Sequence, residues 1–168
     1  MAVFESITES VKNVIKEAKI SAAICEFPFE KKLKYNVPVI CVGIKGGSGV
    51  PAGVGEYLGT KYDAQKDKYI ELYGKKLDIK IGFDIFSPDN ESYGARSCTK
   101  IWGELAGAWS NMPEGIKVRK ISCGTTEYDK SADMYLCEAE MECTAFLYAA
   151  ADDDTGEFLD FKLKGEIV

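Results

Sequence analysis

The sequence predicts an α+β fold: a mostly antiparallel β-sheet, two helices packed on it, and a long β-hairpin at the C-terminus. Apolar residues repeat at helical spacing in two segments, 3–19 and about 88–112. In several other segments they alternate with polar residues, which is the pattern of a strand with one buried face. The chain has 168 residues, enough to bury a core of its own, so we expect one domain over 1–168.

The N-terminal helix is predicted from an apolar stripe that recurs every three or four residues. The stripe consists of Val3, Ile7, Val11, Val14 and Ala18. Two apolar runs follow, Ile24–Phe29 and Val37–Ile44, with a basic turn region between them. They are predicted to be the two strands of a hairpin.

Alternation predicts the central strands. The runs Tyr57–Asp63 and Lys68–Tyr73 flank "AQKD" and are predicted to form a hairpin. In the next segment, "KKLDIKIGFDIFS", every second residue is apolar. The residues predicted to be buried there are Leu77, Ile79, Ile81, Phe83 and Ile85.

The second helix is predicted to begin at Ser87, an N-capping residue type, with Pro88 in the first helical position. Pro113 and Gly115 end it. Its apolar stripe is Cys98, Trp102, Leu105, Trp109 and Met112. Core packing against the sheet explains the two tryptophans better than a cofactor pocket does.

The C-terminal hairpin follows a short predicted strand, Ile116–Cys123. Its first strand, "DMYLCEAEMECTAFLYAA", alternates; "DDDTG" is the turn and "EFLDFKLKGEIV" the return, with Leu159, Phe161 and Leu163 inward. About 17 residues at ~3.3 Å span ~55 Å, whereas a domain of this size is ~40 Å across. The hairpin is therefore expected to bend or to project, and a projecting edge favours self-assembly.

Seven glycines in "VGIKGGSGVPAGVGEYLG" raise the possibility of a phosphate-binding loop. A Walker A motif is absent, and the loose G-x-G-x-x-A at Gly47, Gly49 and Ala52 is followed by Gly53 and Gly55, which disfavour the helix that a dinucleotide site requires. We interpret 46–59 as a long flexible loop that is ordered by a neighbour or by a substrate.

No catalytic, cofactor or metal site is predicted. The chain has no histidine, no CxxC pair and no G-x-S-x-G elbow, so neither zinc binding nor an activated nucleophile is expected. The six cysteines are interpreted as small buried residues in a reducing compartment. The row Glu138, Glu140 and Glu142 leaves three interpretations: a solvated face, pairing with lysines across the sheet or a subunit boundary, or a channel lining past which a polyanion slides.

The composition limits the kinds of partner that we expect this protein to bind. A net charge of −6 with scattered lysines argues against specific nucleic-acid binding, although DNA could pass nearby without adhering. No apolar run is long enough to span a membrane and no signal-peptide pattern is present, so a soluble cytosolic protein is expected.

The order of predicted elements resembles that of the tail terminator, or tail completion, proteins of phage tails and phage-tail-like bacteriocins. It comprises an amphipathic helix, a hairpin ending in "VPVICVGIKG", a long alternating strand, a tryptophan-bearing helix and a long terminal hairpin. The resemblance implies a non-enzymatic protein of which six copies form a ring on the tail tube, contact the sheath, and serve as a collar or neck-docking surface. It also implies location in a virion or tail-like particle assembled in the bacterial cytoplasm.

Two kinds of alternative stay open: another tail component (tube, sheath-initiator or baseplate protein), or a small-molecule-binding or nucleotide-binding α+β domain that uses the glycines. For the assembly hypothesis, two segments are candidate contacts with other subunits or the tube. Their residues are Gly46, Gly47, Gly49, Gly53, Gly55, Glu138, Glu140 and Glu142.

Overall fold

The computed structural model describes residues 3–27, 34–51, 57–151 and 162–163. Within these residues the chain forms two α-helices, a 3₁₀ turn and one seven-stranded sheet, which confirms the predicted α+β class. The elements are α1 (Val3–Glu17), β1 (Ala23–Glu26), β2 (Val39–Pro51), β3 (Tyr57–Asp63), β4 (Lys68–Pro88), α2 (Ala95–Ala108), the 3₁₀ turn (Trp109–Asn111), β5 (Ile116–Asp129), β6 (Met134–Ala151) and β7 (Lys162–Leu163).

The sheet is organised around β4, whose 21 residues make it the longest strand. The strand order is β1-β2-β4-β6-β5, and every described pair except β1 with β2 is antiparallel. β6 follows β4 from Glu71 to Pro88 on one side. On its other side, β4 pairs first with β3 and then with β2. The predicted hairpin of β3 with the start of β4 is thereby confirmed.

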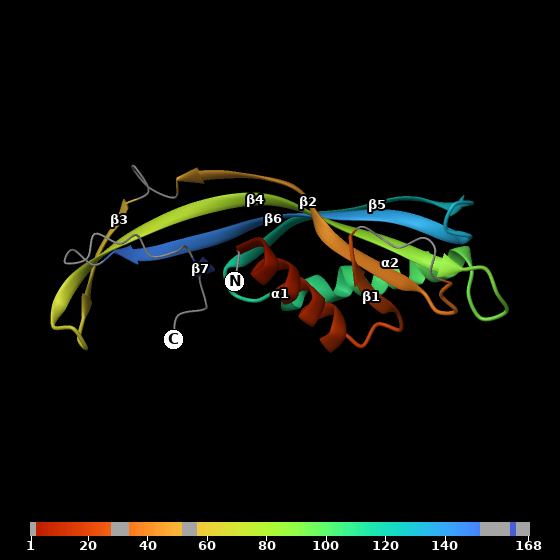
Figure 1. Ribbon diagram of the computed structural model, residues 1–168, viewed down its shortest axis with the longest axis horizontal. Coiled ribbons are helices and arrows are strands. Elements are labelled where there is room, and N and C mark those ends of the chain that lie inside the picture. Colours follow the sequence, from red (N-terminus) through yellow and green to blue (C-terminus); the bar gives the residue numbers. More distant parts are fainter. Residues whose placement is uncertain (1–2, 28–33, 52–56, 152–161, 164–168) are drawn as a thin grey trace.

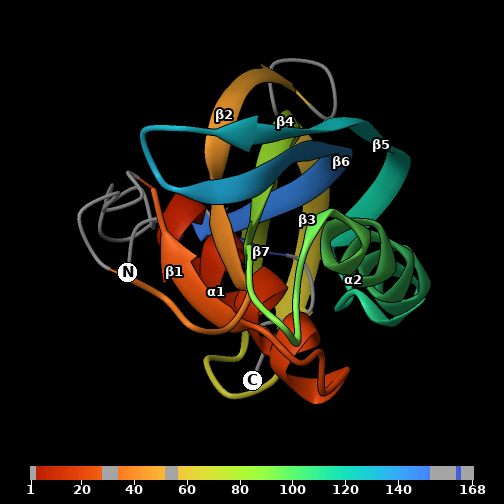
Figure 2. The ribbon, with the colours of Figure 1, turned by 90° about the vertical axis from the view of Figure 1, so that its right-hand side faces the viewer.

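Both helices lie on one face of the sheet, under only part of its length (Figure 1). The end-on view shows α1 and α2 next to each other beneath the strands (Figure 2). Beyond the helices, β2, β3, β4 and β6 continue as a curved sheet (Figure 1). The strands therefore project past the two-layered part of the molecule.

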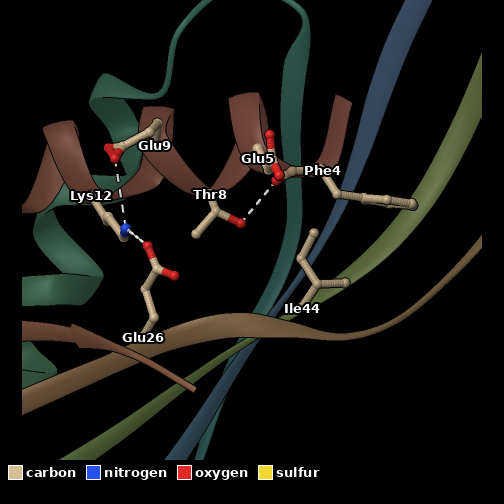
Figure 3. Close-up of a pocket in the computed structure, with 7 residues that line it drawn as sticks. All are labelled: Phe4, Glu5, Thr8, Glu9, Lys12, Glu26 and Ile44. Atoms are coloured by element: carbon tan, nitrogen blue, oxygen red, sulfur yellow. Dashed lines mark hydrogen bonds and ion pairs between the residues drawn. The ribbon is translucent and has the colours of Figure 1, made fainter. Parts of the chain in front are cut away.

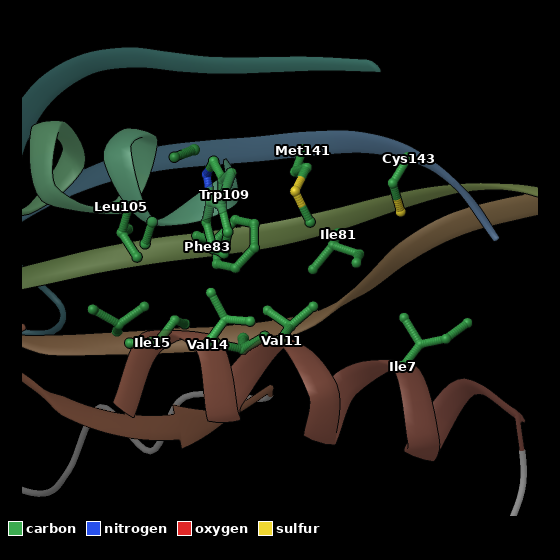
Figure 4. Close-up of a cluster of buried hydrophobic side chains, with 14 of the residues drawn as sticks. Ile7, Val11, Val14, Ile15, Ile81, Phe83, Leu105, Trp109, Met141 and Cys143 are labelled. Atoms are coloured by element: carbon green, nitrogen blue, oxygen red, sulfur yellow. The ribbon is translucent and has the colours of Figure 1, made fainter. Parts of the chain in front are cut away.

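The core lies between the helices and the sheet (Figure 4). The predicted inward residues of β4 are buried: Ile79, Ile81, Phe83 and Ile85 are at most 1% exposed. The Phe83 ring lies 4.8 Å, centroid to centroid, from that of Trp109. From α1 and α2 the cluster takes Ile7, Val11, Val14, Ile15, Cys98, Ile101, Leu105 and Ala108.

The second helix begins later than its capping pattern predicts. Ser87 and Pro88 still belong to β4, where they pair with β6, and α2 starts at Ala95 after Gly94. The Ser97 hydroxyl accepts a hydrogen bond from the Gly94 backbone N–H at 3.3 Å. Strand pairing thus overrides the local N-cap signal at Ser87, since extending the β4–β6 ladder satisfies more backbone groups than a single cap does.

The first two strands do not form the predicted hairpin. β1 runs parallel to the start of β2, with Ala23 opposite Val39 and Cys25 opposite Cys41. A parallel pair needs a connection of about a dozen residues, and the segment from 27 to 38 has that length. Cys25 and Cys41, with Cα atoms 4.7 Å apart, are joined by a disulfide, so the expectation that all six cysteines are thiols is wrong for this pair.

The terminal hairpin is described only in part. β6 forms as predicted, and its inward residues Cys137, Ala139, Met141, Cys143 and Ala145 are at most 2% exposed. β7 pairs antiparallel with Leu147 and Tyr148, in the predicted direction. The "DDDTG" turn and residues Leu159 and Phe161 lie outside the described residues. Most of the long edge of β6 is occupied by β5, which extends to Asp129 rather than ending at Cys123.

Candidate functional site

The glycine segment is strand where the structure describes it. Gly46, Gly47 and Gly49 lie in β2 and pair with β4, so the flexible-loop prediction is wrong for 46–51. It is also wrong for 57–59, which belong to β3. Gly53 and Gly55 lie outside the described residues.

Backbone hydrogen bonding, and not the pattern of side chains, makes these glycines part of a strand. Glycine has no β propensity of its own, but its N–H and C=O groups pair with the exposed edge of β4. A Cβ added at Gly49 would lie 2.8 Å from Leu77 Cδ2, so glycine at this position leaves room for the leucine. The described part of the loose G-x-G-x-x-A is consequently an extended strand.

The projecting part of the sheet is the strongest candidate site, and we call residues 46–51, 57–78 and 144–148 the sheet arm. Its β3–β4 hairpin carries four tyrosines, Tyr57, Tyr62, Tyr69 and Tyr73. Tyr57 lies opposite Tyr73 and Tyr62 opposite Tyr69, with ring centroids 5.8 and 5.4 Å apart. By the alternation of β4, Tyr69 and Tyr73 share a face with Leu77 and the buried isoleucines, which is the helix side.

This tyrosine face is exposed because the helices do not reach it (Figure 1). Tyr69 is 66% exposed, the largest fraction among the large hydrophobic residues that the structure describes, and Tyr62 is 48% exposed. Leu58 of the same hairpin is also about half exposed, as is Val50, which lies opposite Lys76 and therefore on the other face of the arm. A cluster of exposed aromatic and aliphatic side chains on a projecting element is typical of a protein-binding surface.

The sequence interpretation missed these tyrosines, although a repeated pattern marks their position. "YDAQKDKY" and "YDKSADMY" place a tyrosine pair around two hairpin turns, one at each end of the sheet. In each turn the first tyrosine hydroxyl donates to an aspartate, Tyr62 to Asp67 and Tyr128 to Asp133. These hydrogen bonds raise the pKa of Tyr62, and that of Tyr128 to about 12.

The glutamate row lies on the other face of the sheet, as its alternation predicts. Glu142 pairs with Lys80 of the neighbouring strand at 3.7 Å, so the interpretation that the row pairs with lysines across the sheet is confirmed at this position. Gly46, Lys80 and Glu142 share one row across β2, β4 and β6, which brings one residue of each candidate segment onto a common surface. Within the described residues, Glu138 and Glu140 form no ion pair.

Charges crowd at the Glu138 end of the row. Glu138 lies directly opposite Asp84, whose carboxylate is 3.2 Å from the Lys45 ammonium. Burial raises the pKa of Asp84 above its ordinary 3.8; Lys45 acts in the opposite direction and Glu138 adds to the rise. The Lys45 chain crosses Gly82, where a Cβ would lie 2.3 Å from its Cε atom. Glycine at 82 therefore lets Lys45 reach the aspartate.

A second polar cluster joins three strands at the base of the arm. Thr144, which is 1% exposed, donates a hydrogen bond to Asp78 Oδ1 at 2.8 Å. Arg119 Nη2 of β5 approaches the same oxygen at 3.4 Å. The sequence interpretation placed Thr144 on the polar face but did not identify this network, since its members are far apart in the chain.

A groove of about 470 Å³ lies between α1 and the edge formed by β1 and β2 (Figure 3). Lys12 occupies its centre, hydrogen-bonded to Glu26 and 3.6 Å from Glu9. The hydrogen bond to Glu26 raises the pKa of Lys12. Phe4 and Ile44 form its apolar end. The ion pairs tie the helix to β1, so the cluster has a structural role.

The remaining thiols differ in accessibility. Cys98, Cys137 and Cys143 are buried, and burial raises the pKa of Cys98 to about 12 and that of Cys143 to about 11. These two thiols stay protonated at neutral pH and are poor nucleophiles. Cys123 on β5 is exposed.

Across the described ranges there is no group of three or more His, Cys, Asp or Glu side chains placed to hold a metal ion. Among the same residues, no helix has both the length and the apolar character needed to cross a membrane. Comparison with known proteins found no family model and no curated protein that matches this chain.

Proposed function

We propose that the protein is a structural component of a phage-type tail, which assembles as a ring on the tail tube and ends its polymerisation. The observation that carries the proposal is the sheet arm, whose tyrosine face is left uncovered by the helices of its own chain. An uncovered aromatic face of this kind costs solubility unless another protein buries it. The resemblance in element order supplies the identity of the assembly.

A ring requires a head-to-tail contact between different surfaces of neighbouring copies. The arm suits this geometry because it extends beyond its own helices and so reaches an adjacent subunit (Figure 1). Aromatic side chains in pairs, such as Tyr62 with Tyr69, provide large contact areas with few rotatable bonds. A rotation that closes at six copies is what the resemblance implies.

The opposite face of the sheet carries a row of charges along the middle of β6, whereas nearer the arm it carries Phe146 and Tyr148. Glu138 and Glu140 lie there beside the Lys80–Glu142 pair. Turned toward the lumen of a ring, their carboxylates would repel the phosphates of passing DNA and prevent it from adhering. In this arrangement the two candidate segments serve different partners: the arm binds protein, and the glutamate row faces the channel.

Co-expression with the tail-tube protein of the same gene cluster tests the proposal. With the wild-type protein, electron microscopy should show short tubes of uniform length with a ring at one end; without it, the tubes should be long and variable. The double variant Tyr62→Ser/Tyr69→Ser should fold normally, because both rings are about half exposed or more, but should fail to cap the tubes.

Tyr128→Ser provides the matched control. Tyr128 is 43% exposed, and the centroid of its ring lies 5.2 Å from that of Tyr135. It belongs to the β5–β6 turn, at the opposite end of the sheet from the β3–β4 turn. The control should cap tubes as the wild type does. Tubes of unrestricted length in the presence of wild-type protein, or a gene cluster without a tube protein, would contradict the proposal.

A further inference from the structure

We propose that two copies of the protein, when free of a tail, form a twofold-symmetric dimer by antiparallel pairing of their β5 edges. This inference goes beyond the proposed function, because a twofold contact joins a surface to itself and differs from the head-to-tail contact of a ring. It describes the form of the protein before assembly.

β5 is the last strand of the sheet and has a long open edge. Its 14 residues pair with β6 on one side, and within the described residues no strand lies on the other. Most of its residues are exposed or half exposed. The unpaired N–H and C=O groups of such an edge can pair with an added strand.

The charges along β5 identify the partner as a second β5. The first half of the strand is basic, with Lys117, Arg119 and Lys120, and the second half is acidic, with Glu127 and Asp129. Antiparallel pairing about the centre of the strand places each basic half beside the acidic half of the other copy. The twofold axis repeats this attraction, so both ends of the contact are complementary.

The side chains involved also share one face. Lys117 and Lys120 lie opposite Thr144 and Glu142 of β6, and Glu127 and Asp129 lie opposite Leu136 and Met134. By the alternation of β6, all of these positions are on the sheet face away from the helices. Opposite charges on the same face of adjacent strands can form cross-strand pairs, whereas a parallel self-pairing would place like charges together.

The register assigns the axis to the neighbourhood of Cys123, midway between Lys117 and Asp129. Two register shifts, between Val118 and Lys120 and between Cys123 and Thr126, make the edge irregular. Irregular edges pair poorly with arbitrary strands, so charge complementarity decides which strand is accepted. At the axis, Cys123 of one copy lies close to Cys123 of the other.

Charge reversal gives the first test, with light scattering after size exclusion as the readout. The wild type should have the mass of two copies. Lys117→Glu/Lys120→Glu and Glu127→Lys/Asp129→Lys should each weaken dimerisation by at least about tenfold, because like charges then face each other. An equimolar mixture of the two variants should recover the dimer, since an edge that is acidic except for Arg119 then pairs with an all-basic one. Arg96→Glu/Lys100→Glu, the same charge change on the exposed face of α2, should stay dimeric.

A short bis-maleimide reagent gives the second test. It should link two wild-type copies through Cys123, the one exposed thiol among the described free cysteines, and Cys123→Ala should abolish the product. A wild-type monomer, or charge variants that dimerise as the wild type does, would overturn the inference. So would a mixture that fails to recover the dimer. A ring without Cys123 cross-links would overturn the dimer inference and leave the proposed function standing. A dimer of a wild-type protein that fails to cap tubes would support the inference and contradict the proposed function.

Discussion

Replacing Asp78 with alanine should destabilise the protein because it leaves a buried hydroxyl without an acceptor. Thr144 is 1% exposed and donates to Asp78 at 2.8 Å. A buried donor without a partner costs about 1–3 kcal/mol. The Arg119 pair is also lost, but its side chains are 44% and 33% exposed, so it contributes at most about 1 kcal/mol. The free energy of unfolding should fall by about 1–4 kcal/mol.

A second substitution separates the orphaned hydroxyl from other effects. Thr144→Val removes the hydroxyl and keeps a side chain of nearly the same shape. Made alone, it leaves the Asp78 carboxylate without this donor, but that carboxylate is one-third exposed and stays hydrated. Added to Asp78→Ala, it removes the unpaired donor. The double variant should therefore be more stable than Asp78→Ala by about 1 kcal/mol.

Urea denaturation followed by circular dichroism measures these differences, with comparable slopes required for all variants. Arg119→Ala alone gives the contribution of the surface pair. If the double variant were less stable than Asp78→Ala, the unpaired Thr144 hydroxyl would not destabilise the protein. The role assigned to its hydrogen bond would then be wrong.

Three further predictions concern the core, the charged face and the disulfide. Phe83→Ala, at a fully buried ring, should cost about 3–5 kcal/mol in urea denaturation; a smaller loss would show that the core collapses around the site. Asp84 has a raised pKa in the folded protein, so its contribution to stability is fully present below pH 3.8 and is lost as the pH rises through the raised value. The melting temperature of the wild type relative to Asp84→Asn should therefore fall over that range, and a constant difference would contradict the assignment. Reducing the bond between Cys25 and Cys41, 16 residues apart, should cost about 3 kcal/mol, as checked by denaturation with and without dithiothreitol; equal midpoints would refute it.

Strand faces could be predicted from the sequence because the side-chain period of a strand is fixed at two. Ile79, Ile81 and Phe83 alternate with polar residues and are buried, and Glu138 and Glu142 lie on the opposite face. The apolar stripe of α1 was equally informative, since Ile7 and Val11 face the core. In these segments local pattern and tertiary packing agree.

The sequence did not predict which strands pair with each other, because strand pairing depends on backbone hydrogen bonds between segments that are distant in the chain. The glycines from Gly46 to Gly49 have no side-chain pattern, and only the edge of β4 makes them a strand. The parallel pairing of β1 with β2 likewise follows from where the chain re-enters the sheet. The Cys25–Cys41 disulfide depends on that register, which spacing along the chain does not reveal.

The uncovered arm follows from the different rise of helices and strands. β4 has 21 residues and spans about 70 Å, whereas the 15 residues of α1 and the 14 of α2 each span about 22 Å. Because the two helices lie next to each other, their lengths do not add along the strands (Figures 1 and 2). A strand of this length beside helices of this length leaves part of one face uncovered. On β4 that part carries Tyr69 and Tyr73, with Glu71 and Lys75 on the same face. Neither described helix covers this part of the face, and this observation is the reason for our proposal of an assembly function.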